Sequence, residues 1–291
     1  MARTVTQAFD IFLNRLTPLP SQRVAAAKHR ESVENAIRAA MPVNLFRETG
    51  SFNHGTGVRQ HCDMDILVSI RRDRPDSSDT ALRWVKDALQ ARFPFTPVAV
   101  RRPAVVVNFA LGSEPWEITP GFITRRGGEG VFVYDIPGAA SGWIDTAPVE
   151  HLNYVNECNQ RRQTKGGAKK LARLAKAWKY YNRVPISSFY LEMRAAQHVA
   201  TQNSFIPIWD ICQLLEALVE HQLAGMNDPK QAATRFYPCS SEAKKAEALS
   251  KLQSAATRAR NALDAYNDKK TSRAFYYLDL LFGGKFPSPW G

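Results

Sequence analysis

The chain has no cysteine pair with the spacing of a metal site or a redox site. Its four cysteines, Cys62, Cys158, Cys212 and Cys239, are far apart, and no CxxC pattern occurs. Zinc ribbons and thioredoxin-like motifs need closely spaced cysteines, and disulfide frameworks occur mainly in short secreted chains. We therefore predict four reduced thiols and a cytoplasmic location.

Long apolar segments are also absent. A helix that crosses a membrane needs a run of about 20 apolar residues, and the sequence has none. The first 16 residues, MARTVTQAFDIFLNRL, lack the apolar core of a signal peptide. The sequence predicts an intracellular protein without a membrane partner.

Three common catalytic signatures are missing: the P-loop pattern GxxxxGK[ST], HExxH and GxSxG. Their absence argues against a P-loop NTPase, a zincin metalloprotease and an α/β-hydrolase.

What the chain does have is positive charge. Its 39 Lys and Arg residues against 27 Asp and Glu give a net charge of +12, which indicates an anionic partner such as nucleic acid or a nucleoside triphosphate.

The pattern of apolar residues changes along the 291-residue chain. Residues 5–16 and 20–41 have the spacing of helices, and short β-rich runs follow from residue 43 to residue 135. Those runs are VNLF, DILVSI, PVAV, AVVVNFAL, WEIT and VFVY, with a helix near residues 80–93 and a hairpin turn at GGEG. Helices are predicted at residues 146–161, 167–182, 187–201, 207–223, 241–267 and 270–282.

This order predicts an α+β fold, in which a sheet region with N-terminal helices packs against a C-terminal helical bundle. We place the boundary between the two regions near residue 145, giving regions 1–145 and 146–291. A crevice where two such regions meet is the usual place for a ligand.

Two aspartates at the start of the predicted strand DMDILVSI are the first candidates for chemistry. Side chains alternate along a strand, so Asp63 and Asp65 point to the same side, about 6–7 Å apart along the backbone. Like charges at that distance favour a cation between them, and Mg²⁺ prefers carboxylates together with substrate phosphates. The alternative is a strand end whose polar face meets water.

The segment before these aspartates has the features of a phosphate-binding loop. Gly50 and Ser51 follow the strand-like run NLFRET and precede a glycine-containing loop. A glycine at a turn lets backbone N–H groups approach an anion, and the serine hydroxyl adds a donor. His54, in the same loop, is a further candidate donor to phosphate.

A glycine-serine pair followed by DxD twelve residues after Ser51 resembles the polymerase-β-like nucleotidyltransferase superfamily. The fuller set GSFNHGT, DMD and EITPGF resembles more narrowly the bacterial cyclic-oligonucleotide synthases called CD-NTases, relatives of animal cyclic GMP-AMP synthase and oligoadenylate synthase. The resemblance implies a third carboxylate, which matches Glu117, although the family usually has aspartate there. Glu114 is the alternative, on the opposite face of the strand.

A basic helix is predicted in the segment GGAKKLARLAKAWKYYNRVPISSFYLEM. Lys169, Arg173 and Lys176 form one stripe, opposite an apolar stripe of Leu171, Leu174, Ala175, Trp178 and Tyr181. The alternative is a solvated surface helix. A break follows, and Ser187 or Ser188 can cap the next helix. The resemblance implies that a lysine and a serine from these two helices, Lys176 and Ser188, contact the triphosphate of the donor nucleotide.

The resemblance also implies a mechanism. Asp63 and Asp65 hold two Mg²⁺ ions, with Mn²⁺ as an alternative, and Glu117 helps to bind the ion that activates a ribose hydroxyl. The hydroxyl displaces pyrophosphate from a nucleoside triphosphate, ATP among the substrates, whose phosphates contact Gly50, Ser51, Lys176 and Ser188. Repetition and ring closure give a cyclic di- or trinucleotide.

By the same resemblance, the product serves bacterial anti-phage (CBASS) signalling. The segments VRRPAVVVNFA and KAWKYYNRVPISSFYLE are closest to clades that work with HORMA-domain and AAA+ ATPase regulators, and nucleic acid enters only as an activator. Two alternatives stay open. One is a related transferase that acts on an RNA end, a protein or a small molecule, and the other is a non-catalytic nucleic-acid-binding protein that uses the +12 charge.

Overall fold

A computed structural model describes residues 1–110 and 114–290 of the chain. Its first part contains α1 (Val5–Leu16), α2 (Pro20–Ala40), β1 (Val43–Glu48), α3 (Gly50–Asn53), β2 (Met64–Ile70), α4 (Ser78–Arg92), β3 (Val98–Arg101), β4 (Ala104–Phe109), β5 (Glu114–Ile123), β6 (Tyr134–Pro137) and β7 (Trp143–Thr146). Its second part contains α5 (Pro148–Gln160), α6 (Gly167–Tyr181), α7 (Ser188–Ala200), α8 (Pro207–Glu220), α9 (Glu242–Asn267) and α10 (Thr271–Leu281). None of the helices in these described ranges is long and apolar enough to cross a membrane.

The predicted α+β fold is confirmed, and most predicted elements begin and end within a few residues of those observed. The hairpin turn around GGEG joins β5 to β6, which pair antiparallel. Two details of this region are wrong. The strand predicted as VFVY begins only at Tyr134, and β7 was not predicted, because it has four residues and follows a glycine-containing turn. Leu111, the last residue of the predicted strand 104–111, lies outside the described residues.

One sheet contains all the strands of the described chain, in the order β1-β2-β5-β4-β3, and β6 and β7 extend from β5. The pair β2 and β5 is parallel and the other neighbours are antiparallel. Alternate strand residues, such as Ile66, Val68 and Ile118, are buried in a core that α2 and α4 share. The residues between them, including Asp65 and Glu117, therefore point to the opposite face of the sheet.

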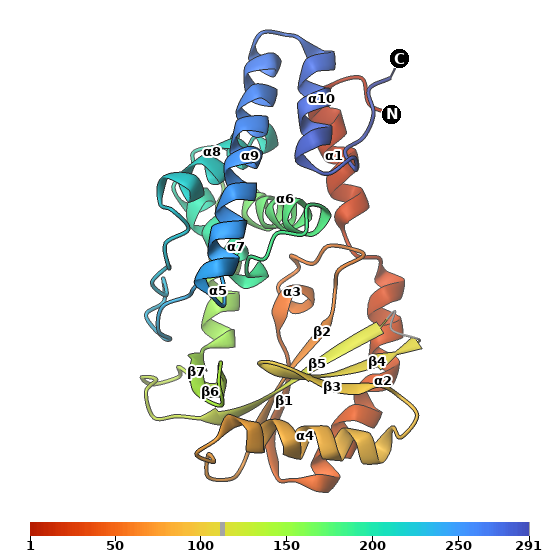
Figure 1. The fold of residues 1–291 in the computed structure, drawn as a ribbon, viewed down its shortest axis with the longest axis vertical. Coiled ribbons are helices and arrows are strands. Elements are labelled where there is room, and N and C mark those ends of the chain that lie inside the picture. Colours follow the sequence, from red (N-terminus) through yellow and green to blue (C-terminus); the bar gives the residue numbers. More distant parts are fainter. Residues whose placement is uncertain (111–113, 291) are drawn as a thin grey trace.

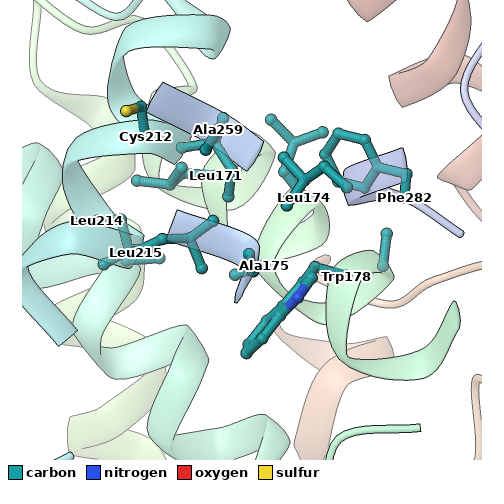
Figure 2. Packing of buried hydrophobic residues seen from close by; sticks show 14 of the residues in the cluster. Leu171, Leu174, Ala175, Trp178, Cys212, Leu214, Leu215, Ala259 and Phe282 are labelled. Atoms are coloured by element: carbon teal, nitrogen blue, oxygen red, sulfur yellow. The ribbon is translucent and has the colours of Figure 1, made fainter. Parts of the chain in front are cut away.

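A second core joins α1 to the helices from α5 to α10. Helix α6 lies at its centre, and Figure 2 shows Leu171, Leu174 and Trp178 of α6 facing side chains of α8, α9 and the C-terminal segment. The predicted apolar stripe of α6 therefore packs inside this core.

Figure 1 shows how the two halves are arranged: the helical half lies above the sheet half, and the short helix α3 reaches up from the sheet half toward α6 and α7.

Candidate active site

Two carboxylates lie side by side on the sheet face opposite α2 and α4. Asp65 of β2 and Glu117 of β5 are direct register partners on parallel strands. Asp63 comes just before β2, two residues from Asp65, and its charge acts on both of these side chains. Glu114 is elsewhere: its carboxylate lies 2.9 Å from Nδ1 of His29, a residue of α2. The structure therefore places Glu117, and not Glu114, beside the two aspartates.

The electrostatics of these acids follow from their closeness and their burial. Burial raises the pKa of Asp65 well above its ordinary value, and the charges of Glu117 and Asp63 raise it further. Burial also raises the pKa values of Asp63 and Glu117, and the Arg101 guanidinium, 3.7 Å from Glu117, opposes this. The three acids therefore repel each other in their ionised forms, so positive charge beside them is stabilising.

The donor chemistry fits a hard divalent cation, because three carboxylates supply only oxygen ligands. No three His, Cys, Asp or Glu side chains in residues 1–110 and 114–290 surround a single point closely enough to hold an ion in this conformation. The Asp65 carboxylate lies against Gly50, and the backbone N–H of Ser51 opposes the rise of the Asp65 pKa. The acids are gathered, but Asp65 is turned toward the glycine-serine turn.

Gly50 makes that contact possible. Its φ angle is +64°, and a Cβ atom added to it would lie 1.8 Å from Oδ2 of Asp65. No side chain fits there, and the left-handed backbone also favours glycine. The segment that starts at Gly50 is a single helical turn, α3, which ends just before the predicted glycine-containing loop. Gly50 and Ser51 thus lie directly against the carboxylates.

The predicted role of Lys176 as a cation facing an open crevice does not agree with its position. Its side chain is buried, forms an ion pair with Glu192 and donates a hydrogen bond to Oγ1 of Thr56 over 2.9 Å. Arg173 donates to the carbonyl oxygens of Gly55 and Gly57 over 2.6 and 3.2 Å. The basic stripe of α6 therefore binds the segment that follows Ser51. Of the three residues of this stripe, only Lys176 is fully buried, and Lys169 and Arg173 are partly exposed.

His54 has a different partner from the one expected. Its Nδ1 lies 2.5 Å from Oε1 of Glu192, and its side chain is buried. The predicted donation to phosphate is therefore not available in this arrangement. Sequence alone gave no reason to link His54 with Glu192, because 138 positions separate them.

The resemblance implies that Lys176 and Ser188 contact the triphosphate, and the lysine that contacts Ser188 in the structure is Lys179. Its Nζ donates to Oγ of Ser188 over 2.5 Å, and the hydroxyl of Tyr180 lies 3.0 Å from the same oxygen. The helix cap is made by Ser187, whose Oγ accepts the backbone N–H of Tyr190, so the Ser188 hydroxyl is not used for capping. Sequence reasoning missed Lys179, although it follows Lys176 by one helical turn.

This pair lies near the carboxylates. Burial lowers the pKa of Lys179 to about 8, the charge of Lys176 lowers it as well, and the charge of Asp63 opposes them. His61, two residues before Asp63, stacks on the ring of Tyr180 with 4.3 Å between centroids. The start of β2 and the end of α6 therefore meet, and they bring acids and a lysine to one place.

Two cavities lie outside this group of acids. One of about 300 Å³ is lined by Ser51, Gly55 and Arg173 and by the residues that join α1 to α2. A larger one of about 470 Å³ lies at the β6–β7 hairpin. Its charged residues pair with one another, as Arg74 does with Asp135 over 3.1 Å. We therefore base the site on the carboxylates and on Lys179, and not on cavity size.

Comparison with known proteins gives a family match. The model of the Second Messenger Oligonucleotide or Dinucleotide Synthetase domain, SMODS, matches residues 3–159. This range contains Gly50, Ser51, Asp63, Asp65 and Glu117. A comparison with curated proteins finds no relative.

Solved structures share the fold over nearly the whole chain. CdnC of E. coli MS115-1, solved with ATP, superposes with a TM-score of 0.75 at 18% identity, covering 97% of this chain and 99% of CdnC. The CdnC complex with a HORMA protein gives 0.74 at 16% identity and covers 97% and 98%. Vibrio cholerae DncV, a cyclic AMP-GMP synthase solved with a linear intermediate, gives 0.64 at 16% identity and covers 84% and 70%.

Proposed function

The chain belongs to the Second Messenger Oligonucleotide or Dinucleotide Synthetase family, and we propose that Asp63, Asp65 and Glu117 form its catalytic centre. The protein is a nucleotidyltransferase that makes cyclic oligonucleotides. The observation that supports the centre most strongly is the register pairing of Asp65 with Glu117 beside Asp63. These are the acids that the sequence singled out, and they come from two segments of the chain, at β2 and at β5.

The acids would hold divalent metal, for which we propose two Mg²⁺ ions, with Mn²⁺ as an alternative. Bound metal would supply activation of a ribose hydroxyl and stabilisation of the charge on the departing pyrophosphate. In this reaction the hydroxyl oxygen would form a bond to the α-phosphorus, the bond from that phosphorus to the bridging oxygen would break with release of pyrophosphate, and the hydroxyl proton would pass to water. Asp63, Asp65 and Glu117 would repel a phosphate by themselves, so their contribution is the negative charge that would hold the metal beside it.

For the triphosphate we propose Gly50, Ser51, Ser188 and Lys179. Because Gly50 has no side chain and a positive φ angle, the Gly50–Ser51 turn lies directly against the Asp65 carboxylate, so a phosphate bound beside Asp65 would also lie beside this turn. Lys179 and Ser188 already lie in hydrogen-bond contact, so an ammonium and a hydroxyl are placed together for phosphate oxygens. In this proposal Lys179, and not Lys176, is the lysine that contacts the triphosphate, because Lys176 forms an ion pair with Glu192.

We further propose that the product is a cyclic di- or trinucleotide made from substrates that include ATP, and that it acts in CBASS anti-phage signalling. The likeness of the fold to CdnC solved with ATP and to DncV solved with its linear intermediate supports the substrate and the product, and the CBASS role rests on the sequence resemblance. A HORMA-domain regulator is proposed because CdnC binds one and the chain matches CdnC over 97% of its length. An AAA+ ATPase as second regulator, and nucleic acid as activator only, rest on the sequence resemblance.

A coupled assay tests the proposed function against a transferase with another acceptor. The protein is incubated with Mg²⁺ and nucleoside triphosphates, and the release of pyrophosphate is followed. The product is then treated with phosphatase, and the amount that survives is measured. We expect release without any added acceptor, and a product that phosphatase does not attack because it has no terminal phosphate. Release that needs an added RNA, protein or small-molecule acceptor would show that the alternative is right.

A further inference from the structure

Glu192 is the centre of a buried polar cluster that no step of the proposed chemistry uses. The exposed fractions of the Glu192 and Lys176 residues are 2% and 1%, and His54 and Thr56 are buried as well. Thr56 and Lys176 both donate to Oε2 of Glu192, and His54 lies against Oε1. Burial by itself raises the pKa of Glu192, but Lys176 and His54 hold it well below its ordinary value. The carboxylate is therefore ionised and fully partnered.

One side of the cluster belongs to the turn that carries Gly50 and Ser51. The backbone N–H of His54 donates to the carbonyl of Gly50 over 3.0 Å, and the N–H of Thr56 donates to the carbonyl of Ser51 over 2.9 Å. The side chains of these same two residues contact Glu192. The Glu192 carboxylate therefore connects, through one residue on each path, to the backbone of Gly50 and Ser51.

The other side belongs to the helices that carry Ser188 and Lys179. Glu192 lies four residues after Ser188 in α7, and Lys176 lies three residues before Lys179 in α6, so each is about one helical turn away. Through Lys176 and Thr56, Glu192 therefore joins both helices to the turn at Gly50. Figure 1 shows α3 on one side of this junction and α6 and α7 on the other.

We propose that Glu192 is a positioning residue for nucleotide binding, which holds the Gly50–Ser51 turn at a fixed distance from Ser188 and Lys179. The inference rests on the proposed function of these four residues as triphosphate contacts. An ion pair buried this deeply is poor evidence for stability, because desolvation offsets most of the attraction. Its value here is geometric: a carboxylate with three directed partners fixes the relative position of three segments more narrowly than apolar packing does.

The test uses two variants and one matched control. Glu192→Gln removes the charge and keeps the shape, and Thr56→Val removes one donor with no change of charge. The control is Asp210→Asn, because Asp210 is also a buried carboxylate on a helix, with His198 at 3.1 Å, but has no link to the Gly50 turn. Melting temperatures are measured for all three, so that loss of stability is separated from loss of position.

Two readouts report on position. The first is amide hydrogen exchange in residues 50–57, which we expect to become about tenfold faster in Glu192→Gln and in Thr56→Val. The second is the dissociation constant of α,β-methylene-ATP, an analogue that cannot release pyrophosphate, which we expect to rise about tenfold in Glu192→Gln. Asp210→Asn should lower the melting temperature but leave both readouts at the wild-type value.

Several outcomes would overturn the inference. The inference is overturned if Glu192→Gln and Thr56→Val show the exchange rates and the dissociation constant of the wild type. It is also overturned if Asp210→Asn changes both readouts by the same amount as Glu192→Gln. If Glu192→Gln does not fold, Thr56→Val decides the question by the same two readouts. If the wild-type protein does not bind the analogue, the proposed triphosphate site is wrong and the inference falls with it. Wild-type binding with unaffected variants overturns the inference alone.

Discussion

Asp65 and Glu117 are direct partners on parallel strands, and the ionised form of each raises the free energy of the folded protein. The pKa of Asp65 is raised well above its ordinary value by burial, by Glu117 and by Asp63. The folded protein therefore binds more protons than the unfolded chain above the ordinary aspartate pKa. Stability falls as pH rises from that value to the folded-state pKa, and it stays reduced at higher pH.

It follows that Asp65→Asn should stabilise the protein in the absence of metal, while abolishing synthesis. We expect a gain of about 1 kcal/mol, or roughly 2–4 °C in melting temperature, in EDTA at pH 7.5. Adding Mg²⁺ should raise the melting temperature of the wild type and not that of the variant. A variant that melts below the wild type in EDTA, or that Mg²⁺ still stabilises, would contradict the electrostatic account.

The choice between the two glutamates of β5 can be tested with a matched pair. Glu117→Gln should lower kcat/KM at least about a hundredfold, because it removes a metal-binding charge. Glu114→Gln changes the same residue type three positions away, but its side chain contacts His29 and Trp116 on the other face. It should keep a rate near that of the wild type. Steady-state rates of pyrophosphate release decide between them, and equal losses would mean that the strand face was assigned wrongly.

Gly50 provides a steric test of the contact with Asp65. Gly50→Ala places a Cβ atom where Oδ2 of Asp65 lies and also strains the backbone at a φ angle of +64°. Gly130→Ala is the control, since its φ angle is +74° and an added Cβ meets nothing within 4 Å. Both should lose about 1–2 kcal/mol of folding stability from backbone strain. Only Gly50→Ala should also lose synthesis, as measured by product formed per enzyme at a temperature where both are folded.

Lys179 should make nucleotide affinity depend on pH. Its pKa is lowered to about 8, so the ammonium is present below that pH and is lost as pH rises through it. The dissociation constant of α,β-methylene-ATP should therefore increase between pH 7 and pH 9. Lys179→Met should weaken binding about tenfold to a hundredfold at pH 7 and remove that pH dependence. A variant with unchanged affinity at pH 7 would show that Lys179 does not contact the triphosphate.

Lys176→Met should behave differently from Lys179→Met. It leaves the buried Glu192 without its ion-pair partner, which costs about 3–5 kcal/mol of folding stability. Because the charge of Lys176 is one of the causes that lower the pKa of Lys179, its removal should also move the pH dependence of binding upward. Denaturant unfolding measures the first effect and pH titration of analogue binding measures the second. A fall in affinity without loss of stability would place Lys176 in the open site.

Much of this fold could be predicted from the sequence because its signals are local. The apolar stripe of α6 is a periodic pattern, and the strand through Ile66 and Val68 is an unbroken apolar run. The partners of Lys176 could not be predicted, because Thr56 and Glu192 meet it only through tertiary packing. The helical period shows that Lys176 does not belong to the apolar stripe of α6. It does not show whether water, phosphate or a buried carboxylate lies opposite.

The candidate site, like the fold, could be predicted only in part from the sequence. The spacing of Asp63 and Asp65 predicted their shared side, and the odd separation of Glu114 and Glu117 predicted opposite faces, but the choice of Glu117 came from the family resemblance. Their closeness to Lys179 depends on how α6 sits against β2, and no local pattern contains that information. The residue that differs from the family's usual aspartate, Glu117, occupies the register position opposite Asp65.

The most direct test of the account is the mass of the product made by the wild type and by Asp63→Asn/Asp65→Asn. Each protein is incubated with Mg²⁺ and all four ribonucleoside triphosphates, with a HORMA-domain partner added in parallel, and the phosphatase-treated products are resolved by mass. We expect a cyclic di- or trinucleotide from the wild type and none from the folded double variant. A double variant that still makes the cyclic product would contradict the assignment of the carboxylates.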